Sequence, residues 1–344
     1  MTTNLDVDEM PKWLQSIYKL SDYKNVIAGI NDDDCAIIRI GKETLIISSD
    51  YLNASPIAIE LGIGNYWNLG RLLVAANLSD ICGTGAYAIG FISSIMLDKD
   101  NCSEDEYKNL MEGIIYELEN HKIPLLGGDS KLGKATSLCG TIIGIQEQGS
   151  GLFLKNNAKV GDQIWVSGNL GGVSSSIYGV KLNNNKINEW SRDKITTPDI
   201  PYLKSRKLSK LHIANSGTDI SDGLGADLWN LCSSSNVGCI VNNYDIPISE
   251  ETYLIGREIG IEPWKFAFTI GGDFQFLVTV PSRHNQQMLD LGFVKIGQIT
   301  DSKECYIQTK NNKIDTMPKI GHRDVNTLSF ENEMDILLNL KKND

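Results

Sequence analysis

The stretch SGTDISDGLGADLWNLC, Ser216–Cys232, carries three carboxylates, Asp219, Asp222 and Asp227, separated by Ser221 and by glycines. An apolar helical pattern follows them. Glycine lets the backbone come close to a ligand, and carboxylates that converge repel one another unless a cation lies between them. The stretch therefore predicts the end of a strand or helix that binds a cation.

The length, composition and net charge of the chain indicate what kind of protein it is. Its 344 residues exceed one ordinary domain of about 100–150 residues. We therefore expect two domains, residues 1–150 and 151–344. Hydrophobic residues make up 41% and charged residues 22%, which is typical of a globular protein and excludes a fibrous or disordered chain. The net charge of −11 argues against a nucleic-acid partner, because such a partner needs clustered Lys and Arg.

Neither a membrane nor a disulfide framework is expected. The first residues are acidic where a signal peptide is basic, and no apolar run reaches about 18 residues. The sequence thus predicts a cytoplasmic protein. The seven cysteines form no CxxC pair and have no histidine at metal-ligand spacing, so we interpret them as reduced, mostly buried small residues.

Periodicity predicts a mixture of strands and helices in both halves. A helix that starts near residue 67 is expected to end near Asp80, and Ser103 with Glu106 has the spacing of a capping box that begins the next helix. The polar tract 182–194 is interpreted as a loop, and a helix is predicted near 250–259. Strands are predicted over 35–40 and 44–52, joined as a hairpin, and over 87–97, 124–130, 136–145, 163–167, 238–244, 266–280 and 293–300.

Acidic residues beside Gly or Ser recur along the whole chain. If these segments converge, their all-oxygen donors favour Mg²⁺ or Ca²⁺, and the neighbouring backbone N–H groups suit phosphate oxygens. Any one of them is also typical of a helix cap or a turn without function. The metal interpretation therefore depends on convergence. The segments are NDDDC (32–34), SSD (Asp50), NLSD (Asp80), GGDS (Asp129), DISDG (219 and 222) and GGD (Asp273).

Two established nucleotide or metal motifs do not fit. GGDSKLGKAT approaches the P-loop pattern, but Ala135 occupies the position of the magnesium-binding hydroxyl, and a strand rather than a helix is predicted to follow. Twelve residues counted from Asp219 end at Asn230, where a calcium-binding EF-hand loop has Glu.

Nucleophilic catalysis has little support. The sequence has no G-x-S-x-G motif, and its four histidines lie in ordinary polar surroundings. No catalytic side chain is therefore predicted, and a metal-assisted transfer without a covalent intermediate is expected.

Taken in order, the segments GINDDDCAII, LIISSDYL, LLVAANLSDICGTGA, LLGGDS, AKVGDQIWVSGNLG, SGTDISDGLGADL and IGGDFQFLVTVP resemble the thiamine-monophosphate kinases. The resemblance covers residues from about 29 to 297. It implies a mixed α/β fold of two domains, like that of aminoimidazole ribonucleotide synthetase, with mixed sheets flanked by helices. It also implies a homodimer formed by the N-terminal domain. The implied reaction is direct transfer of the γ-phosphoryl group of ATP, held by Mg²⁺, to thiamine monophosphate.

The resemblance also assigns roles to residues of this chain. The implied metal ligands are Asp33, Ser48, Ser49, Asp50, Asp80, Asp129, Asp219 and Asp222. The implied nucleotide contacts are Gly128, Asp129, Ser221 and Lys155, and the implied substrate contacts are Asp273, Gln275 and His322.

The chain departs from the family pattern at positions that the resemblance implies contact the substrate. YLNASPIAIE lacks the usual His and Phe, IGGDFQFL has Gln275 where the family has a carboxylate, and TTPDIPY lacks two arginines. Two alternatives therefore stay open beside a thiamine-monophosphate kinase. The first is a relative that phosphorylates a different small molecule, and the second is a nucleotide-binding protein without turnover.

Overall fold

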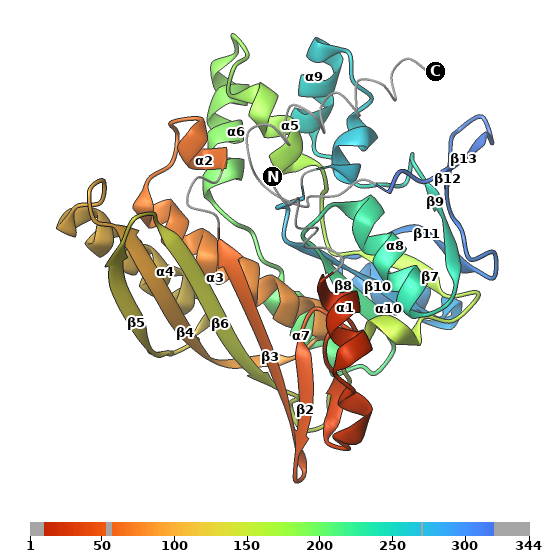
Figure 1. Ribbon diagram of the computed structural model, residues 1–344. Coiled ribbons are helices and arrows are strands. Elements are labelled where there is room, and N and C mark those ends of the chain that lie inside the picture. Colours follow the sequence, from red (N-terminus) through yellow and green to blue (C-terminus); the bar gives the residue numbers. More distant parts are fainter. Residues whose placement is uncertain (1–9, 53–56, 270, 320–344) are drawn as a thin grey trace, which may run out of the picture.

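The computed structural model describes residues 10–52, 57–269 and 271–319, and its first half forms a six-stranded mixed sheet (Figure 1). The strand order is β1-β2-β3-β6-β4-β5; β4 and β5 run parallel, and the other neighbours are antiparallel. Helices α3 (Tyr66–Thr84) and α4 (Glu104–His121) lie behind one face of this sheet. The other elements are α1 (Met10–Ile17), η2 (Leu20–Asp22), β1 (Val26–Ala28), β2 (Ala36–Ile40), β3 (Glu43–Leu52), α2 (Ile57–Glu60), β4 (Tyr87–Asp98), β5 (Leu125–Gly133) and β6 (Ser137–Ile145).

The predicted hairpin and the capped helix are confirmed. β2 pairs antiparallel with β3, and the Ser103 side chain accepts a hydrogen bond from the backbone N–H of Glu106 at the start of α4. The predicted end of α3 near Asp80 is wrong. α3 continues to Thr84, because Ile81 and Cys82 are buried in the core, and it ends where Gly85 adopts φ 75°. Asp80 is therefore held rigidly inside a helix.

The second half forms a seven-stranded mixed sheet in the order β13-β12-β9-β11-β7-β10-β8. Only β12 and β9 run parallel among its pairs. The strands are β7 (Gln163–Val166), β8 (Ser216–Ile220), β9 (Gly238–Asn242), β10 (Gln275–Val280), β11 (Val294–Thr300), β12 (Cys305–Gln308) and β13 (Ile314–Thr316). The helices are η3 (Lys155–Asn157), α5 (Gly172–Gly179), α6 (Asn185–Thr196), α7 (Tyr202–Ser209), α8 (Leu224–Ser234), α9 (Glu250–Ile259), η4 (Pro263–Phe268), η5 (Ser282–His284) and α10 (Asn285–Asp290).

Two sequence interpretations of this half are wrong. The polar tract taken for a loop forms α6, whose Asn184 side chain caps the backbone N–H of Ile187 while Ile187 and Ser191 are buried. The predicted strand over 266–280 starts only at Gln275, because residues 263–268 form a 3₁₀ helix that begins with a proline. In both cases local capping and burial outweigh composition.

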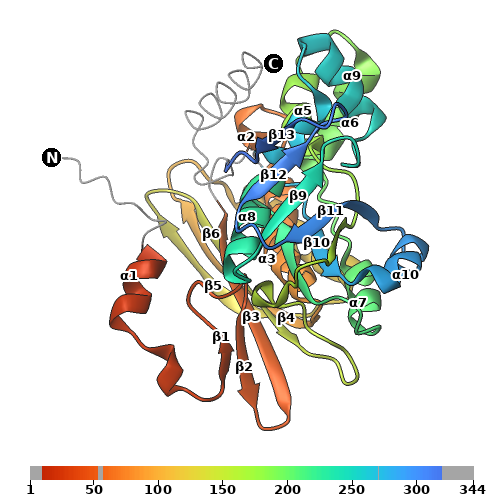
Figure 2. The same ribbon diagram turned by 90° about the vertical axis from the view of Figure 1, so that its right-hand side faces the viewer.

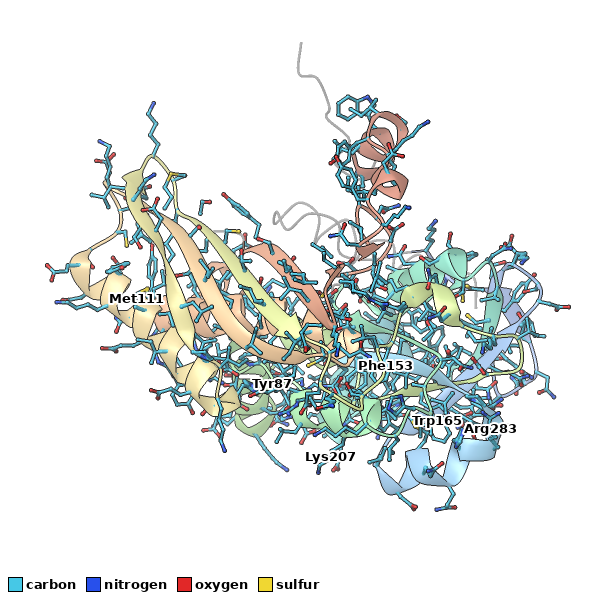
Figure 3. The ribbon with its side chains drawn as sticks, turned by 90° about the horizontal axis from the view of Figure 1, so that it is seen from below. Tyr87, Met111, Phe153, Trp165, Lys207 and Arg283 are labelled. Atoms are coloured by element: carbon cyan, nitrogen blue, oxygen red, sulfur yellow. The ribbon has the colours of Figure 1, made fainter. Side chains whose placement is uncertain are left out.

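Helix α3 lies between the two halves and positions the site (Figures 1 and 2). It contacts β3 and β6 of the first sheet and β8 and β10 of the second. Phe153, labelled where the halves meet in Figure 3, packs against the backbone of Gly85 and Gly217. A Cβ atom at Gly83 would lie 2.6 Å from the backbone nitrogen of Asp219, so glycine allows α3 and β8 to come this close. In the described residues, no helix is long and apolar enough to span a membrane.

Candidate metal and phosphate site

Carboxylates from both halves of the chain converge beside α3. Asp34 precedes β2, Asp80 lies in α3, and Asp219 lies near the end of β8. Each offers an oxygen atom, and these three atoms lie within 4.8 Å of one another. The convergence on which the metal interpretation depends is therefore present.

Strand β3 adds polar groups on the side that faces α3. Ser48 is 5% exposed, and its hydroxyl donates a hydrogen bond to Asp80 Oδ2. Two residues further along the same face, the backbone N–H of Asp50 donates to Asn77 Oδ1 at 3.1 Å. Burial raises the pKa of Asp50, and the charge of Asp34 raises it further, while a hydrogen bond with Asp80 lowers it. Ser48 and Asp50 therefore belong to the cluster.

Asp219 is the most deeply buried carboxylate of the three, with 1% of its surface exposed. Ser79 Oγ donates to Asp219 Oδ2 at 2.7 Å, but Asp219 Oδ1 is buried without a hydrogen-bond partner. Burial and then the charge of Asp34 raise the pKa of Asp219 to about 8. An unpartnered buried carboxylate oxygen is costly. A cation bound between the three carboxylates would satisfy it.

Lys155, at the start of η3, is the positive charge inside this cluster. Its Nζ forms an ion pair with Asp34, and its backbone N–H donates to Asp33 Oδ2 at 2.9 Å. Burial alone would lower the pKa of Lys155, but the charges of Asp34, Asp219 and Asp33 raise it above its usual value. Burial and the charge of Asp34 raise the pKa of Asp33 to about 7. Lys155 thus partly offsets a local excess of negative charge.

The start of α8 supplies two further carboxylates. The backbone N–H of Asp222 donates to Asp227 Oδ2 at 3.2 Å, and Asp227 is 5% exposed. Burial and then the charges of Asp222 and Asp219 raise the pKa of Asp227 well above its usual value. Ser221, half-buried, is fixed by its backbone oxygen, which accepts from Gly272 N at 3.1 Å. The Asp222 and Asp227 side chains therefore interact electrostatically with the cluster.

The same forces act on Asp80, which is 7% exposed in the middle of the cluster. Burial raises its pKa well above the usual value, and the charges of Asp50, Asp219 and Asp34 add to the effect. A hydrogen bond from Ser48 acts in the opposite direction. Electrostatic repulsion of this kind is relieved by a bound divalent cation.

Two predicted metal ligands do not join the cluster. Ser49 faces the opposite side of the sheet, where its hydroxyl lies 2.9 Å from Thr141 Oγ1. Asp129 is exposed on the edge strand β5, pairs with Ser94 on that same side, and forms an exposed ion pair of 3.0 Å with Lys131. Gly128, the neighbouring predicted nucleotide contact, lies on β5 as well. Strand alternation separates the side chains of Ser49 and Asp129 from those of Ser48 and Asp50.

Two of the predicted substrate residues, Asp273 and Gln275, have hydrogen-bond partners within the fold. Asp273 is buried and accepts from the backbone N–H groups of Gly171 at 2.6 Å and Val173 at 3.1 Å, at the start of α5. Burial raises its pKa, and these bonds lower it. Gln275 accepts from Ser167 Oγ at 2.8 Å. Its Nε2 donates to the Asp199 carbonyl at 3.1 Å. His322 lies outside the described residues.

The roles implied by the family resemblance did not include Asp34, Asp227 or Ser79, although all three take part in the cluster. Asp34 was visible in the NDDDC run, and Asp227 in the acidic stretch before α8. Thr218 Oγ1 donates to Asp34 Oδ2 at 2.9 Å and fixes which member of the run points inward. No pattern within the run shows this choice, because it depends on a contact between distant segments.

Comparison with known proteins identifies the family of both halves of the chain. Residues 32–146 match the family described as AIR synthase related protein, N-terminal domain, and residues 159–310 match its C-terminal domain. The chain is 30% identical over 289 residues to the thiamine-monophosphate kinase of Pyrococcus abyssi, covering 84% of this chain and 88% of that protein. It is 32% identical over 311 residues to the enzyme of the same name from Buchnera aphidicola subsp. Schizaphis graminum, covering 87% and 92%.

A solved structure has the same fold. AaThiL complexed with AMPPCP and TMP matches with a TM-score of 0.79 and 20% sequence identity, covering 94% of this chain and 100% of that chain. Both sheets and the helices between them thus have a counterpart in a solved protein.

Proposed function

The chain belongs to the thiamine-monophosphate kinase family, and on that premise we propose that it transfers the γ-phosphoryl group of ATP to thiamine monophosphate. The single observation that carries the proposal is the convergence of Asp34, Asp80 and Asp219 within 4.8 Å. These residues come from three separate segments of the chain. A clustering that is costly without a cation is typical of a site that binds a metal together with phosphate groups.

The residues present fit magnesium. All donors at the centre are oxygens, the ligand type that Mg²⁺ prefers, and Asp219 Oδ1 has no other partner. Asp34, Asp80 and Asp219 would hold the ion, with Asp33, Ser48, Asp50 and Asp222 around them. When bound, magnesium would neutralise the negative charges of the phosphate groups during phosphoryl transfer.

The protein's own groups position the reactants. Ser48, Ser79 and Thr218 each donate to one carboxylate and so fix its orientation. Lys155 brings positive charge to a place where two anionic substrates must meet. Roles for Gly128 and Asp129 in nucleotide binding, for Asp273, Gln275 and His322 in substrate binding, and for Ser49 in metal binding stay predictions, as does the cytoplasmic location.

No general base is needed in this reaction, because the attacking oxygen belongs to a phosphate that is already ionised at neutral pH. The described histidines agree with this. His121 contacts Glu117, His212 contacts the Gly149 carbonyl, and His284 contacts Gln287. None of these contacts involves a residue of the carboxylate cluster.

The proposal is tested with purified protein, ATP, MgCl₂ and thiamine monophosphate. We expect equal amounts of thiamine diphosphate and ADP, and no product when EDTA exceeds magnesium. Thiamine is the matched acceptor control, because it lacks the phosphate that must attack. ADP release that depends on another phosphorylated acceptor would reject thiamine monophosphate as substrate. Magnesium-dependent ATP binding without any turnover would reject the enzymatic proposal itself.

We also infer that the N-terminal sheet pairs with a second copy of the chain. Among the described residues, no helix covers the face formed by β3, β6, β4 and β5, and this face exposes 72% of Tyr51 and 39% of Met96 (Figure 1). Exposed apolar surface next to an unpaired edge strand favours association.

The inferred dimer predicts the behaviour of one surface variant. Ser94→Arg places a charge in the middle of this face and should convert a dimer to a monomer in sedimentation velocity. Ser234→Arg, the same change at the exposed end of α8, should leave the dimer intact. A monomeric parent protein at micromolar concentration would contradict the inference.

A further inference from the structure

Three cysteines that the sequence scatters over 74 positions meet in the second half of the chain. Cys232 lies near the end of α8, Cys239 in β9 and Cys305 in β12, and they are 1%, 0% and 0% exposed. Their Sγ atoms all lie within 4.8 Å of one another. The remaining cysteines do not join this group, so a specific thiol cluster exists that cysteine spacing did not predict.

The backbone fixes each member of the cluster. Cys239 and Cys305 are direct partners in the parallel β9–β12 pair, and Cys239 N donates to the Glu304 carbonyl at 3.1 Å. Val237 N donates to the Cys232 carbonyl at 2.9 Å. A Cβ atom at Gly238 would lie 2.3 Å from the Glu304 carbonyl oxygen, so this glycine allows β9 to approach the chain before β12. The three sulfurs therefore converge from one helix and two paired strands.

We propose that Cys232, Cys239 and Cys305 bind one soft monovalent cation of the copper(I) type in trigonal coordination. Thiolate sulfur selects soft metals such as Cu(I) over magnesium. A trigonal ion with metal–sulfur bonds of about 2.3 Å places the sulfurs about 4.0 Å apart. Because the sulfurs already lie within 4.8 Å, shifts of less than about 1 Å would complete the site.

The number of donors favours Cu(I) over zinc. Structural zinc sites have four ligands, and among the described residues no histidine, carboxylate or further cysteine completes this group. The surroundings are apolar: the cluster lies in a core with Leu231, Val241 and Met317.

Binding is balanced by proton release. Cu(I) enters as the reduced ion, the S–H bonds of the three cysteines break, and their three protons pass to solvent, because a cysteine binds a metal as the thiolate. The three thiolates then share the ion. Metal binding that displaces a proton from cysteine is pH-dependent for this reason.

The bound ion would link α8 to the sheet. Cys232 lies near the end of the helix whose first turn carries Asp227 of the carboxylate cluster. The ion would cross-link this helix to β9 and β12, and a ligand that binds only the folded state stabilises it. The site is chemically separate from the magnesium site, because one offers sulfur and the other oxygen.

The test uses the full, reduced and EDTA-treated protein, titrated anaerobically with Cu(I) in the presence of the coloured Cu(I) chelator bicinchoninate. We expect one equivalent of Cu(I) to be withheld from the chelator by the parent protein. Cys239→Ser and Cys305→Ala should each weaken this binding at least about 100-fold. X-ray absorption of the copper complex should show three sulfur neighbours.

The control is the double variant Cys102→Ser/Cys139→Ser, which removes the two partly exposed thiols and keeps the cluster. It should retain the full equivalent. Melting curves of all variants without copper separate loss of binding from loss of fold. The proposal is overturned if the folded parent withholds no copper, if the control loses the binding, or if the spectrum shows fewer than three sulfur neighbours.

Discussion

Replacing Asp80 by asparagine is expected to lower kcat/KM for phosphoryl transfer by about 10²- to 10³-fold. Asp80 is central to the cluster: it accepts from Ser48, and its carboxylate oxygen lies within 4.8 Å of those of Asp34 and Asp219. The amide keeps the size of the side chain but removes one of the charges that would hold magnesium. The activity should recover only in part when the MgCl₂ concentration is raised. A titration from micromolar to roughly 20 mM MgCl₂ measures this recovery.

The same variant should be no less stable than the parent protein in EDTA. Burial and three neighbouring carboxylates oppose ionisation of Asp80, so its carboxyl group adds repulsion when no cation is present. A neutral amide removes that repulsion. Thermal melting in EDTA measures this, and a clear fall in Tm would show that the loss of activity came from the fold.

Asp100→Asn provides the matched control, because it removes one carboxylate from an exposed turn. It should leave both kcat/KM and the magnesium titration unchanged. An equal loss of activity in Asp100→Asn would mean that net charge, and not the cluster, determines turnover.

The sequence was sufficient to predict the acidic site because its motifs are local. The segments around Asp50, Asp80 and Asp219 each combine Asp with Ser or Gly, and periodicity indicated a mixture of strands and helices. The strand parity of β3 could have separated Ser49 from Ser48 and Asp50, since side chains alternate along a strand. The family resemblance implied all three residues as metal ligands. A list of implied ligands does not say on which face of a sheet each side chain lies.

The remaining features depend on contacts between distant segments. Asp34 is chosen over its neighbours in the acidic run by Thr218 and Lys155, which lie more than 100 residues away in the sequence. Helix α6 forms in a polar tract because two of its side chains find a buried position. The three-cysteine cluster requires the register of β9 with β12. Such choices are made by tertiary packing, which outweighs local propensity.

Lys155→Met should lower the free energy of unfolding of the metal-free protein by about 3–5 kcal/mol near pH 8, because removal of one partner leaves buried charges unpaired. The Lys155 side chain is 12% exposed and its partner Asp34 16%. Methionine retains most of the length and packing of the lysine stem, so the change isolates the charge. Urea unfolding in EDTA measures the difference.

The effect should depend on pH in a defined direction. The folded pKa values of Asp33 and Asp219 are raised to about 7 and about 8, above the value of about 3.9 in an unfolded chain. The stability linked to these protons is fully present below about pH 4 and is lost as the pH rises through about 7 and 8. Lys155 opposes this loss while the carboxylates are ionised, so the penalty of Lys155→Met should be smaller at pH 5 than at pH 8.

Lys108→Met is the matched control for the same substitution. Lys108 pairs with Glu104 on α4, away from the inferred dimer face, and the two side chains are 58% and 81% exposed. Exposed ion pairs contribute less than about 1 kcal/mol, so its unfolding should hardly change at either pH. Equal penalties for Lys155→Met at pH 5 and pH 8 would show that the lysine stem is needed for packing. A penalty that grows with pH for Lys155→Met alone would identify Lys155 as the charge that holds the carboxylates together before a cation arrives.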